Sequence, residues 1–302
     1  MHAFTHLRAG RMSMKFKKIL INPLVLFLLI SFSGISQNSR QSTISTKEIM
    51  EKMFVSVKQL RTVKFIMKDW ERRENRNREG EQHIKVNISP FWVYAYIAKP
   101  SKGVEALWRQ GENNNKVLVH PNSFPYISLN LDPNGSLVRS GSHHNLFEAN
   151  PNYTAEIIRD TYKKVGKEFP NIFKYEGDVV FDGKECYKIV INYTPYELYN
   201  NQVKTGEDVF SIAQKLYLNE FKIKELNKLK DYTGLKAGQT LVLPNSYAKK
   251  TILFIDKKTF LPLVQVIHDE LGFFERYEYH DLQVNPTFKK DVFTRDFPAY
   301  HF

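Results

Sequence analysis

From Val63 the chain contains strand-like runs separated by turns, but this pattern breaks off near Tyr199 and resumes near Lys249. Before the break, runs such as VKFIMKDWER from Val63 are separated by turns that contain Gly. After the break, residues 250–286 again follow a pattern of strand, turn, strand, turn and strand. Because this rhythm is typical of an antiparallel sheet, we expect one sheet domain interrupted by an inserted segment.

A helix is expected before the first strand. Apolar residues recur at helical spacing between Ile49 and Leu60, which predicts a helix over 46–59 with Thr46 as its N-cap. Residues 145–169 predict one or two short helices, with Asn152 or Thr154 as a cap. Together with the strands, these helices indicate an α+β fold.

The interrupting segment has a complete pattern of its own. A short strand near YNNQVK is followed by a first helix with Asp208 as its N-cap, then by a second helix capped by Asn219 and a second strand. The apolar stripes of the two helices are Val209, Ile212, Ala213 and Leu216, then Ile223, Leu226 and Leu229. This predicts a βααβ module over 199–249.

The module resembles the LysM family, which binds peptidoglycan and chitin. TGEDVFSIAQKL at 205–216, IKELNKL at 223–229 and LKAGQTLVLP at 235–244 carry the resemblance. It implies that the glycan lies between two loops: Lys204, Thr205, Gly206, Glu207, Asp208 and Val209 in the first, and Lys228, Leu229, Lys230, Asp231, Tyr232 and Leu235 in the second. Val209 and Tyr232 are expected to pack against sugar faces. Glu207-Asp208 replaces the usual Asp-Thr, so an alternative is a module with only a structural or protein-contact role.

The flanking sequence resembles an uncharacterised exported family within the LolA/LolB-like superfamily. SPFWVYAYIAKPSKGVEALWRQGENNNKVLVHP at 89–121 and FIDKKTFLPLVQVIHDELGFFERYEYHDLQVNP at 254–286 carry this resemblance. It implies a curved antiparallel half-barrel with covering helices, formed by 46–198 and 250–302. The candidate residues for an apolar ligand are Trp70, Phe91, Trp92, Tyr94 and Tyr96. In the alternative, these aromatics form the packing core.

The N-terminal sequence predicts export. The basic run MKFKK from Met14 precedes the apolar run ILINPLVLFLLISF, and Gly34 and Ser36 fit cleavage before Gln37. We therefore expect a signal peptide over 1–36, or alternatively an uncleaved anchor, followed by a flexible lead-in over 37–45. The single cysteine, Cys186, lies in a predicted strand and is expected to be a buried thiol.

The charge is basic without a basic cluster. The 44 Lys and Arg residues exceed the 32 Asp and Glu residues by 12. Five of the basic residues and none of the acids lie in 1–36, so the remainder carries +7 (39 minus 32). This spread excess argues against a nucleic-acid partner. Within 199–250, nine Lys exceed five acids, which suits an anionic cell wall.

No motif predicts catalysis, a metal or a cofactor. His143 and His144 are neighbours without metal-ligand spacing, so a solvated loop is expected there. The charged residues of 268–275 are expected to be solvated in a hairpin, and those of 69–81 at the tip of another. The sequence therefore predicts a non-catalytic, periplasmic protein that binds peptidoglycan and an apolar ligand or a partner protein. The alternative is a lipid or lipoprotein carrier in which the LysM fold is only structural.

Overall fold

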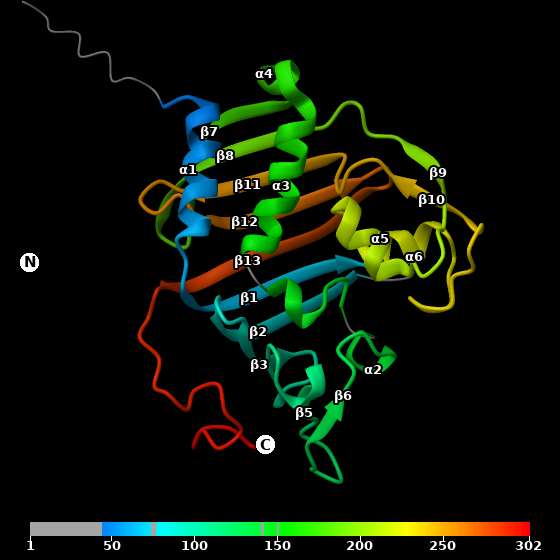
Figure 1. Ribbon diagram of the computed structural model, residues 1–302. Coiled ribbons are helices and arrows are strands. Elements are labelled where there is room, and N and C mark those ends of the chain that lie inside the picture. The colour runs from blue at the N-terminus through cyan, green and yellow to red at the C-terminus, as the bar shows by residue number, and fades with distance from the viewer. Residues whose placement is uncertain (1–43, 74–76, 140–141, 150) are drawn as a thin grey trace, which may run out of the picture. The chain divides into compact units, whose positions relative to one another are not determined.

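The computed structural model describes residues 44–73, 77–139, 142–149 and 151–302, and Figure 1 shows how they are arranged. The predicted signal peptide (1–36) and most of the predicted lead-in lie outside the described residues. None of the helices within these ranges combines the length and the apolar composition that crossing a membrane requires.

A single large sheet dominates the described part of the chain. Its eleven strands are antiparallel, in the order β6-β5-β4-β3-β2-β1-β13-β12-β11-β8-β7. Their bounds are β1 Thr62–Arg72, β2 Asn77–Asn87, β3 Trp92–Lys99, β4 Val104–Arg109, β5 Val117–His120, β6 Leu129–Leu131, β7 Phe173–Phe181, β8 Lys184–Asn192, β11 Lys250–Asp256, β12 Pro262–Asp269 and β13 Gly272–Val284. Because β6 and β7 are end strands, the sheet is open, which confirms the expected fold class.

The inserted segment connects two neighbouring strands. β8 and β11 pair directly, with Asn192 opposite Lys250, although residues 193–249 separate them in sequence. The chain therefore leaves the sheet and returns to the adjacent position, so the insertion interrupts no strand pairing. Between them lie β9 (Leu198–Gln202), α5 (Val209–Leu216), α6 (Glu220–Leu226) and β10 (Thr240–Pro244), and β9 pairs with β10. This is the predicted strand, helix, helix, strand order.

Helices cover one face of the sheet (Figure 1). α1 (Thr46–Lys58) and α3 (Pro151–Val165) bury their apolar stripes in one core with inward residues of the strands. The shorter helical segments are η1 (Asn113–Asn115), α2 (Ser136–Arg139), η2 (Leu146–Ala149), η3 (Gly166–Glu168) and α4 (Phe169–Ile172). α1 begins where it was predicted, but its cap is Ser45 and not Thr46. The Ser45 hydroxyl accepts the Glu48 N–H at 3.1 Å, and the backbone of Ser45 is extended.

The opposite face of the sheet is partly covered by the segment that follows β13. Phe288, Val292, Phe293, Phe297 and Tyr300 pack there with Tyr94 and Leu107. The sheet is therefore buried on both sides at β3 and β4.

Candidate ligand cavity and glycan-binding loops

A cavity of about 410 Å³ lies between the helix-covered face of the sheet and α3 with η2. Its apolar wall comes mainly from alternate residues of the strands and from α3: Phe65, Met67, Ile84, Ala95, Ile97, Ala106, Val119, Leu131, Ile157 and Ile158. The period of two in the strands explains this lining, because every second side chain points to the same face. The volume lies within the range of small-molecule sites.

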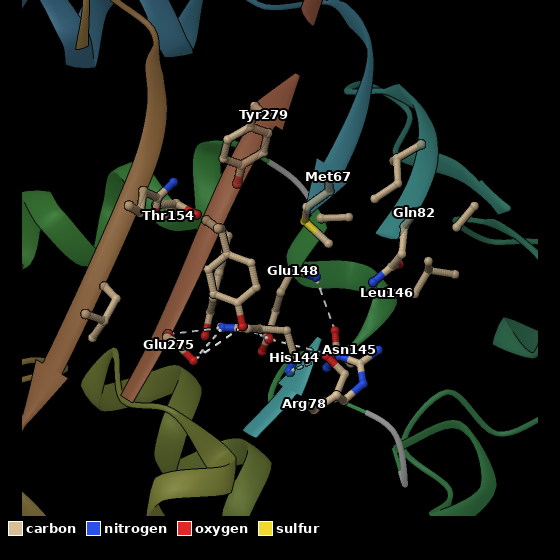
Figure 2. Close-up of a pocket in the computed structure, with 18 of the residues that line it drawn as sticks. Met67, Arg78, Gln82, His144, Asn145, Leu146, Glu148, Thr154, Glu275 and Tyr279 are labelled. Atoms are coloured by element: carbon tan, nitrogen blue, oxygen red, sulfur yellow. Dashed lines mark hydrogen bonds and ion pairs between the residues drawn. The ribbon is translucent and has the colours of Figure 1, made fainter. Parts of the chain in front are cut away.

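One end of the cavity is polar. Arg78, Ser142, His144, Asn145, Glu148, Tyr247, Glu275 and Tyr277 line it. Figure 2 shows His144, Glu148 and Glu275 together at this end, with Met67 and Tyr279 further along the wall. The cavity thus combines an apolar body with a group of buried, hydrogen-bonded charges.

His144 lies between two carboxylates. Its Nδ1 is 2.5 Å from Glu148 Oε2, and its Nε2 is 3.4 Å from Glu275 Oε1. Burial lowers the pKa of His144, but the charges of Glu275 and Glu148 outweigh burial and raise this pKa well above its usual 6.5. The two carboxylates therefore favour the protonated form of this partly buried imidazole.

Glu275 interacts with several of the polar side chains at this end of the cavity. It is 2.8 Å from His143 Nδ1 and accepts the Tyr247 hydroxyl at 2.7 Å. Burial raises the pKa of Glu275, but His144 and His143 outweigh burial and hold it well below its usual 4.5. His143 Nε2 faces the Arg72 carbonyl at 2.8 Å, so both ring nitrogens of His143 face acceptors.

Glu71 and Asp69 extend the group along β1. Glu71 accepts the Ser142 hydroxyl at 2.9 Å, the His143 N–H at 3.0 Å and the Tyr277 hydroxyl at 2.9 Å. Asp69 pairs with Arg78 at 2.6 Å. Asp69 and Glu71 are 1% and 0% exposed, so the predicted solvated hairpin tip is wrong for these residues. The alternation that buries Val63 and Phe65 also places Asp69 and Glu71 on the inward face.

Two further expectations of solvated charge are also wrong. His143 is 0% exposed, and Asp269 and Glu275 are 3% and 1% exposed. Each of these groups finds its partner on a segment distant in sequence, which a local pattern does not reveal. Within the described ranges, no group of three or more His, Cys, Asp or Glu side chains has an arrangement that holds a metal ion.

The five aromatic residues proposed for an apolar ligand are all described, and none of them lines this cavity. Tyr94 stacks on Tyr300 at 3.8 Å, and Trp92 packs on Phe293, both on the opposite face. Tyr94 and Tyr96 line a more open groove there instead. Phe91 packs against Trp108 beside the core, and Trp70 lies under the Arg276 guanidinium. Within β3, side chains that alternate with Trp92, Tyr94 and Tyr96 line the cavity instead, namely those of Ala95 and Ile97.

The two loops predicted to hold a glycan lie side by side. The Val209 N–H donates to the Tyr232 carbonyl at 3.3 Å. Lys204, Thr205 and Gly206 are exposed in the first loop, and Lys228, Lys230 and Asp231 are exposed in the second. Leu229, Tyr232 and Leu235 are half-buried against the core of the module. The loops therefore offer an exposed backbone and basic side chains on one surface.

Three residues of the first loop already have partners inside the module. Val209 is 0% exposed in the core of the module, so its side chain does not contact a sugar, contrary to expectation. Asp208 caps α5 as predicted, accepting the Ser211 N–H at 2.7 Å. Glu207 accepts the Lys204 N–H at 3.0 Å and pairs with Lys215 at 3.2 Å. These internal contacts occupy both carboxylates.

The module is fixed to the sheet domain by buried contacts. Phe221 of α6 stacks on His143, with ring centroids 4.1 Å apart. The Lys222 ammonium bonds to Asp269 at 2.7 Å and to Glu270 at 2.6 Å. Tyr247, which follows β10, lines the cavity. The module and the cavity therefore share one continuous set of contacts.

A second connection passes through α2. Arg139 is 2% exposed, pairs with Glu220 at 3.2 Å and lies 5.0 Å from the Tyr232 ring. Burial and the nearby Glu148 raise the pKa of Glu220 to about 8. Arg139 and Glu220 were not predicted from the sequence, because they pair with each other across separate segments of the chain.

Comparisons with known sequences match two parts of the chain. A family described as "Protein of unknown function (DUF1571)" matches residues 61–217, and the LysM domain matches residues 202–244. The chain thus contains a LysM domain between β8 and β11. No curated protein matches the chain.

Solved structures are similar only remotely. The lipoprotein LppX of Mycobacterium tuberculosis is 12% identical, with 80% of this chain and 97% of that one covered and a TM-score of 0.39. A LolA superfamily protein of Nitrosomonas europaea is 10% identical, with 84% and 99% covered and a TM-score of 0.32. In the MucA/MucB complex of Pseudomonas aeruginosa, the matched chain is 8% identical, with 82% and 59% covered and a TM-score of 0.36.

Proposed function

We propose that this chain, which belongs to the DUF1571 family of proteins of unknown function, is a non-catalytic cell-envelope protein with two binding sites. One site is the pair of LysM loops, for the N-acetylglucosamine-containing backbone of peptidoglycan. The other is the cavity of the sheet domain, for an apolar ligand. No cofactor is required at either site.

The main support for the glycan site is that two exposed loops are connected by a hydrogen bond in a segment that matches the LysM domain. Exposed residues of both loops, such as Thr205, Gly206 and Lys230, present polar groups that suit the hydroxyl and acetamide groups of a sugar. Lys204, Lys228 and Lys230 add positive charge at the surface, which favours an anionic wall polymer. The internal partners of Glu207 and Asp208 reduce the repulsion that two free carboxylates would exert.

The cavity supports the second site through its composition. A ligand with an apolar chain would bury it against the strand residues and α3. A polar group of the same ligand would meet Ser142, Asn145 and the tyrosine hydroxyls at the charged end. A fatty acid, a lipid and the acyl chain of a lipoprotein all have this amphipathic character.

The proposed organisation follows the predicted boundaries. Residues 199–249 form the LysM module, 46–198 and 250–302 form the sheet domain, and 1–36 direct export. Binding to peptidoglycan favours a periplasmic location for the exported chain.

A second function is favoured by the buried contacts of α6. Phe221 and Lys222 fix the module to the sheet domain, as a purely structural insert would be fixed. In that case the protein is a lipid or lipoprotein carrier, and the module supports the cavity without binding glycan.

The test is sedimentation with insoluble peptidoglycan. Deleting the module would also remove Tyr247 and Phe221, so substitutions at exposed positions are a cleaner design. We expect Lys228→Glu with Lys230→Glu to reduce the bound fraction about fivefold, because two charges at the loops are reversed. Lys163→Glu with Lys174→Glu makes the same charge change at exposed positions of α3 and β7 and serves as the matched control.

Sedimentation of the wild type and of the control, with loss in the loop variant, would support glycan binding by the loops. If the wild type stays in the supernatant, the structural function of the module replaces the glycan function. If all three proteins sediment equally, the contact with peptidoglycan lies elsewhere on the chain.

A further inference from the structure

The connection between β5 and β6 exposes an unusual concentration of apolar side chains. Among the described residues, eleven large apolar side chains are exposed, and four of them lie between Phe124 and Leu129. Phe124 is 88% exposed, Tyr126 63%, Ile127 55% and Leu129 40%. A hydrogen bond from the Tyr126 N–H to the Ser123 carbonyl, 2.6 Å long, closes a turn that presents these side chains. Solvation of such a cluster is unfavourable, which indicates a contact surface.

The turn between β3 and β4 adds positive charge beside this connection. The Asn122 side-chain amide donates to the Lys102 carbonyl at 3.1 Å, which holds the two segments together. Lys99 and Lys102 are exposed. Neither residues 97–103 nor residues 120–131 contain an Asp or Glu. We define the apolar and basic surface formed by these two segments as the β5–β6 patch.

The β5–β6 patch is continuous with the cavity. Pro100 and Ser101 of the β3–β4 turn and Leu131 of β6 line the cavity as well. The same two segments that expose the patch therefore form part of the cavity wall. A molecule that reaches this wall from outside would pass the exposed aromatic and aliphatic side chains.

We propose that the β5–β6 patch docks on the surface of an anionic lipid bilayer. Aromatic side chains with a polar group, such as Tyr126, are stable at the boundary between water and acyl chains. Lys side chains place their ammonium groups at the headgroups while their stems contact apolar surface. The patch combines these features and lacks opposing acids. A protein partner or a second copy of the chain is the competing occupant, and the test distinguishes both from lipid.

The experiment measures co-sedimentation with lipid vesicles. It uses residues 44–302, which form one compact unit, because the apolar run in the N-terminal region would bind lipid by itself. One set of vesicles contains phosphatidylglycerol and phosphatidylcholine, and the other contains phosphatidylcholine alone. The patch variant carries Phe124→Ser, Tyr126→Ser and Ile127→Ser.

The matched control replaces exposed apolar residues outside the patch, with Val180→Ser in β7, Leu271→Ser beside β13 and Val55→Ser in α1. We expect the wild type and the control to bind the anionic vesicles and the patch variant to bind roughly tenfold more weakly. A second variant, Lys99→Gln with Lys102→Gln, is expected to weaken binding to anionic vesicles only. Unchanged far-ultraviolet circular dichroism verifies that each variant is folded.

Three results would overturn the proposal. The first is that the wild type binds neither kind of vesicle. The second is that the patch variant binds vesicles as well as the wild type does. The third is that lipid binding is absent and the wild type forms a dimer that the patch variant does not form, which would assign the patch to self-association. Because the patch is separate from the LysM loops, sedimentation of the patch variant with peptidoglycan reports on the proposed glycan site independently.

Discussion

At the scale of single residues, the unusual feature is the burial of several charges beside an apolar cavity. An isolated buried carboxylate is strongly destabilising. Glu71 and Glu275 avoid this cost because each accepts several hydrogen bonds and faces at least one cation. His144 is stabilised by carboxylates on both sides of its ring. The group is therefore stable only as a whole, and removing one member leaves another charge unpaired.

The opposite pKa shifts of His144 and Glu275 predict the pH dependence of stability. The folded-state pKa of His144 is raised, so its stabilisation is complete below about pH 6.5 and is lost as pH rises. That of Glu275 is lowered, so its stabilisation is present above about pH 4.5 and is lost as pH falls. We expect the wild-type free energy of unfolding in urea to decrease from pH 6.5 to 8.5. Glu275→Gln should lower it by about 3 kcal/mol at pH 6 and reduce this decrease.

Tyr247→Phe is the control for a loss of hydrogen bonds without a loss of charge, because the Tyr247 hydroxyl donates to Glu275 and accepts from Asn219. We expect a loss of about 1 to 2 kcal/mol and an unchanged pH dependence. Glu220, whose pKa is raised to about 8, leaves a residual decrease of the same sign in both variants. Equal pH dependence in Glu275→Gln and the wild type would contradict the ion pairing described here.

Sequence patterns could have revealed part of this group. The alternation of β1 places Asp69 and Glu71 on the face of Val63 and Phe65, so two acids were predictable on an inward surface. His143 offered no such signal, because it lies in an irregular segment whose position depends on contacts with Phe221 and Glu275. Local periodicity reports which face a residue occupies, but not which distant segment supplies its partner.

At the scale of elements, local sequence signals were reliable where a side chain forms a hydrogen bond with a nearby backbone group of its own segment. Asp208 and Asn219 cap α5 and α6 as predicted, because a side chain three residues before an amide reaches it directly. Cys186 is buried in β8, as its strand pattern predicted. The contact between α6 and the sheet domain was not predictable in this way, since it depends on the tertiary position of Asp269.

Lys222 is expected to hold α6 against the sheet domain. Its side chain is 2% exposed, and it bonds to Asp269 and Glu270. Lys222→Met should lower the free energy of unfolding by about 2 to 3 kcal/mol, because Asp269 and Glu270 lose a buried partner while Asp269 keeps its pair with Arg72 at 2.7 Å. Hydrogen exchange should also become faster in α6. The measurement combines urea unfolding with amide exchange.

Lys215→Met is the matched control within the module. Lys215 pairs with Glu207, but its side chain is 58% exposed, so the expected loss is below about 1 kcal/mol. If the two variants lose the same stability, the contact of Lys222 does not fix the module, and the contacts of Phe221 with His143 and of Glu220 with Arg139 would hold it instead.

At the scale of the whole molecule, the insertion between neighbouring strands explains how one protein can accommodate the two proposed binding sites. β8 and β11 pair across the insertion, so the sheet retains its order, while Tyr247 of the inserted segment lines the cavity. The proposed glycan loops lie on the part of the module that remains exposed. Both sites should therefore be occupied at the same time.

The most direct test is to ask whether the protein carries a cavity ligand onto peptidoglycan. The protein is loaded with a fluorescent fatty acid and sedimented with insoluble peptidoglycan, and fluorescence is measured in the pellet. Ala106→Phe places a larger side chain in the cavity wall and should abolish fluorescence in the pellet without preventing sedimentation. Lys228→Glu with Lys230→Glu should leave most of the protein and of the fluorescence in the supernatant. We predict that the wild type brings the fatty acid into the pellet. A wild-type pellet that contains the protein without fluorescence would contradict simultaneous binding at the two sites.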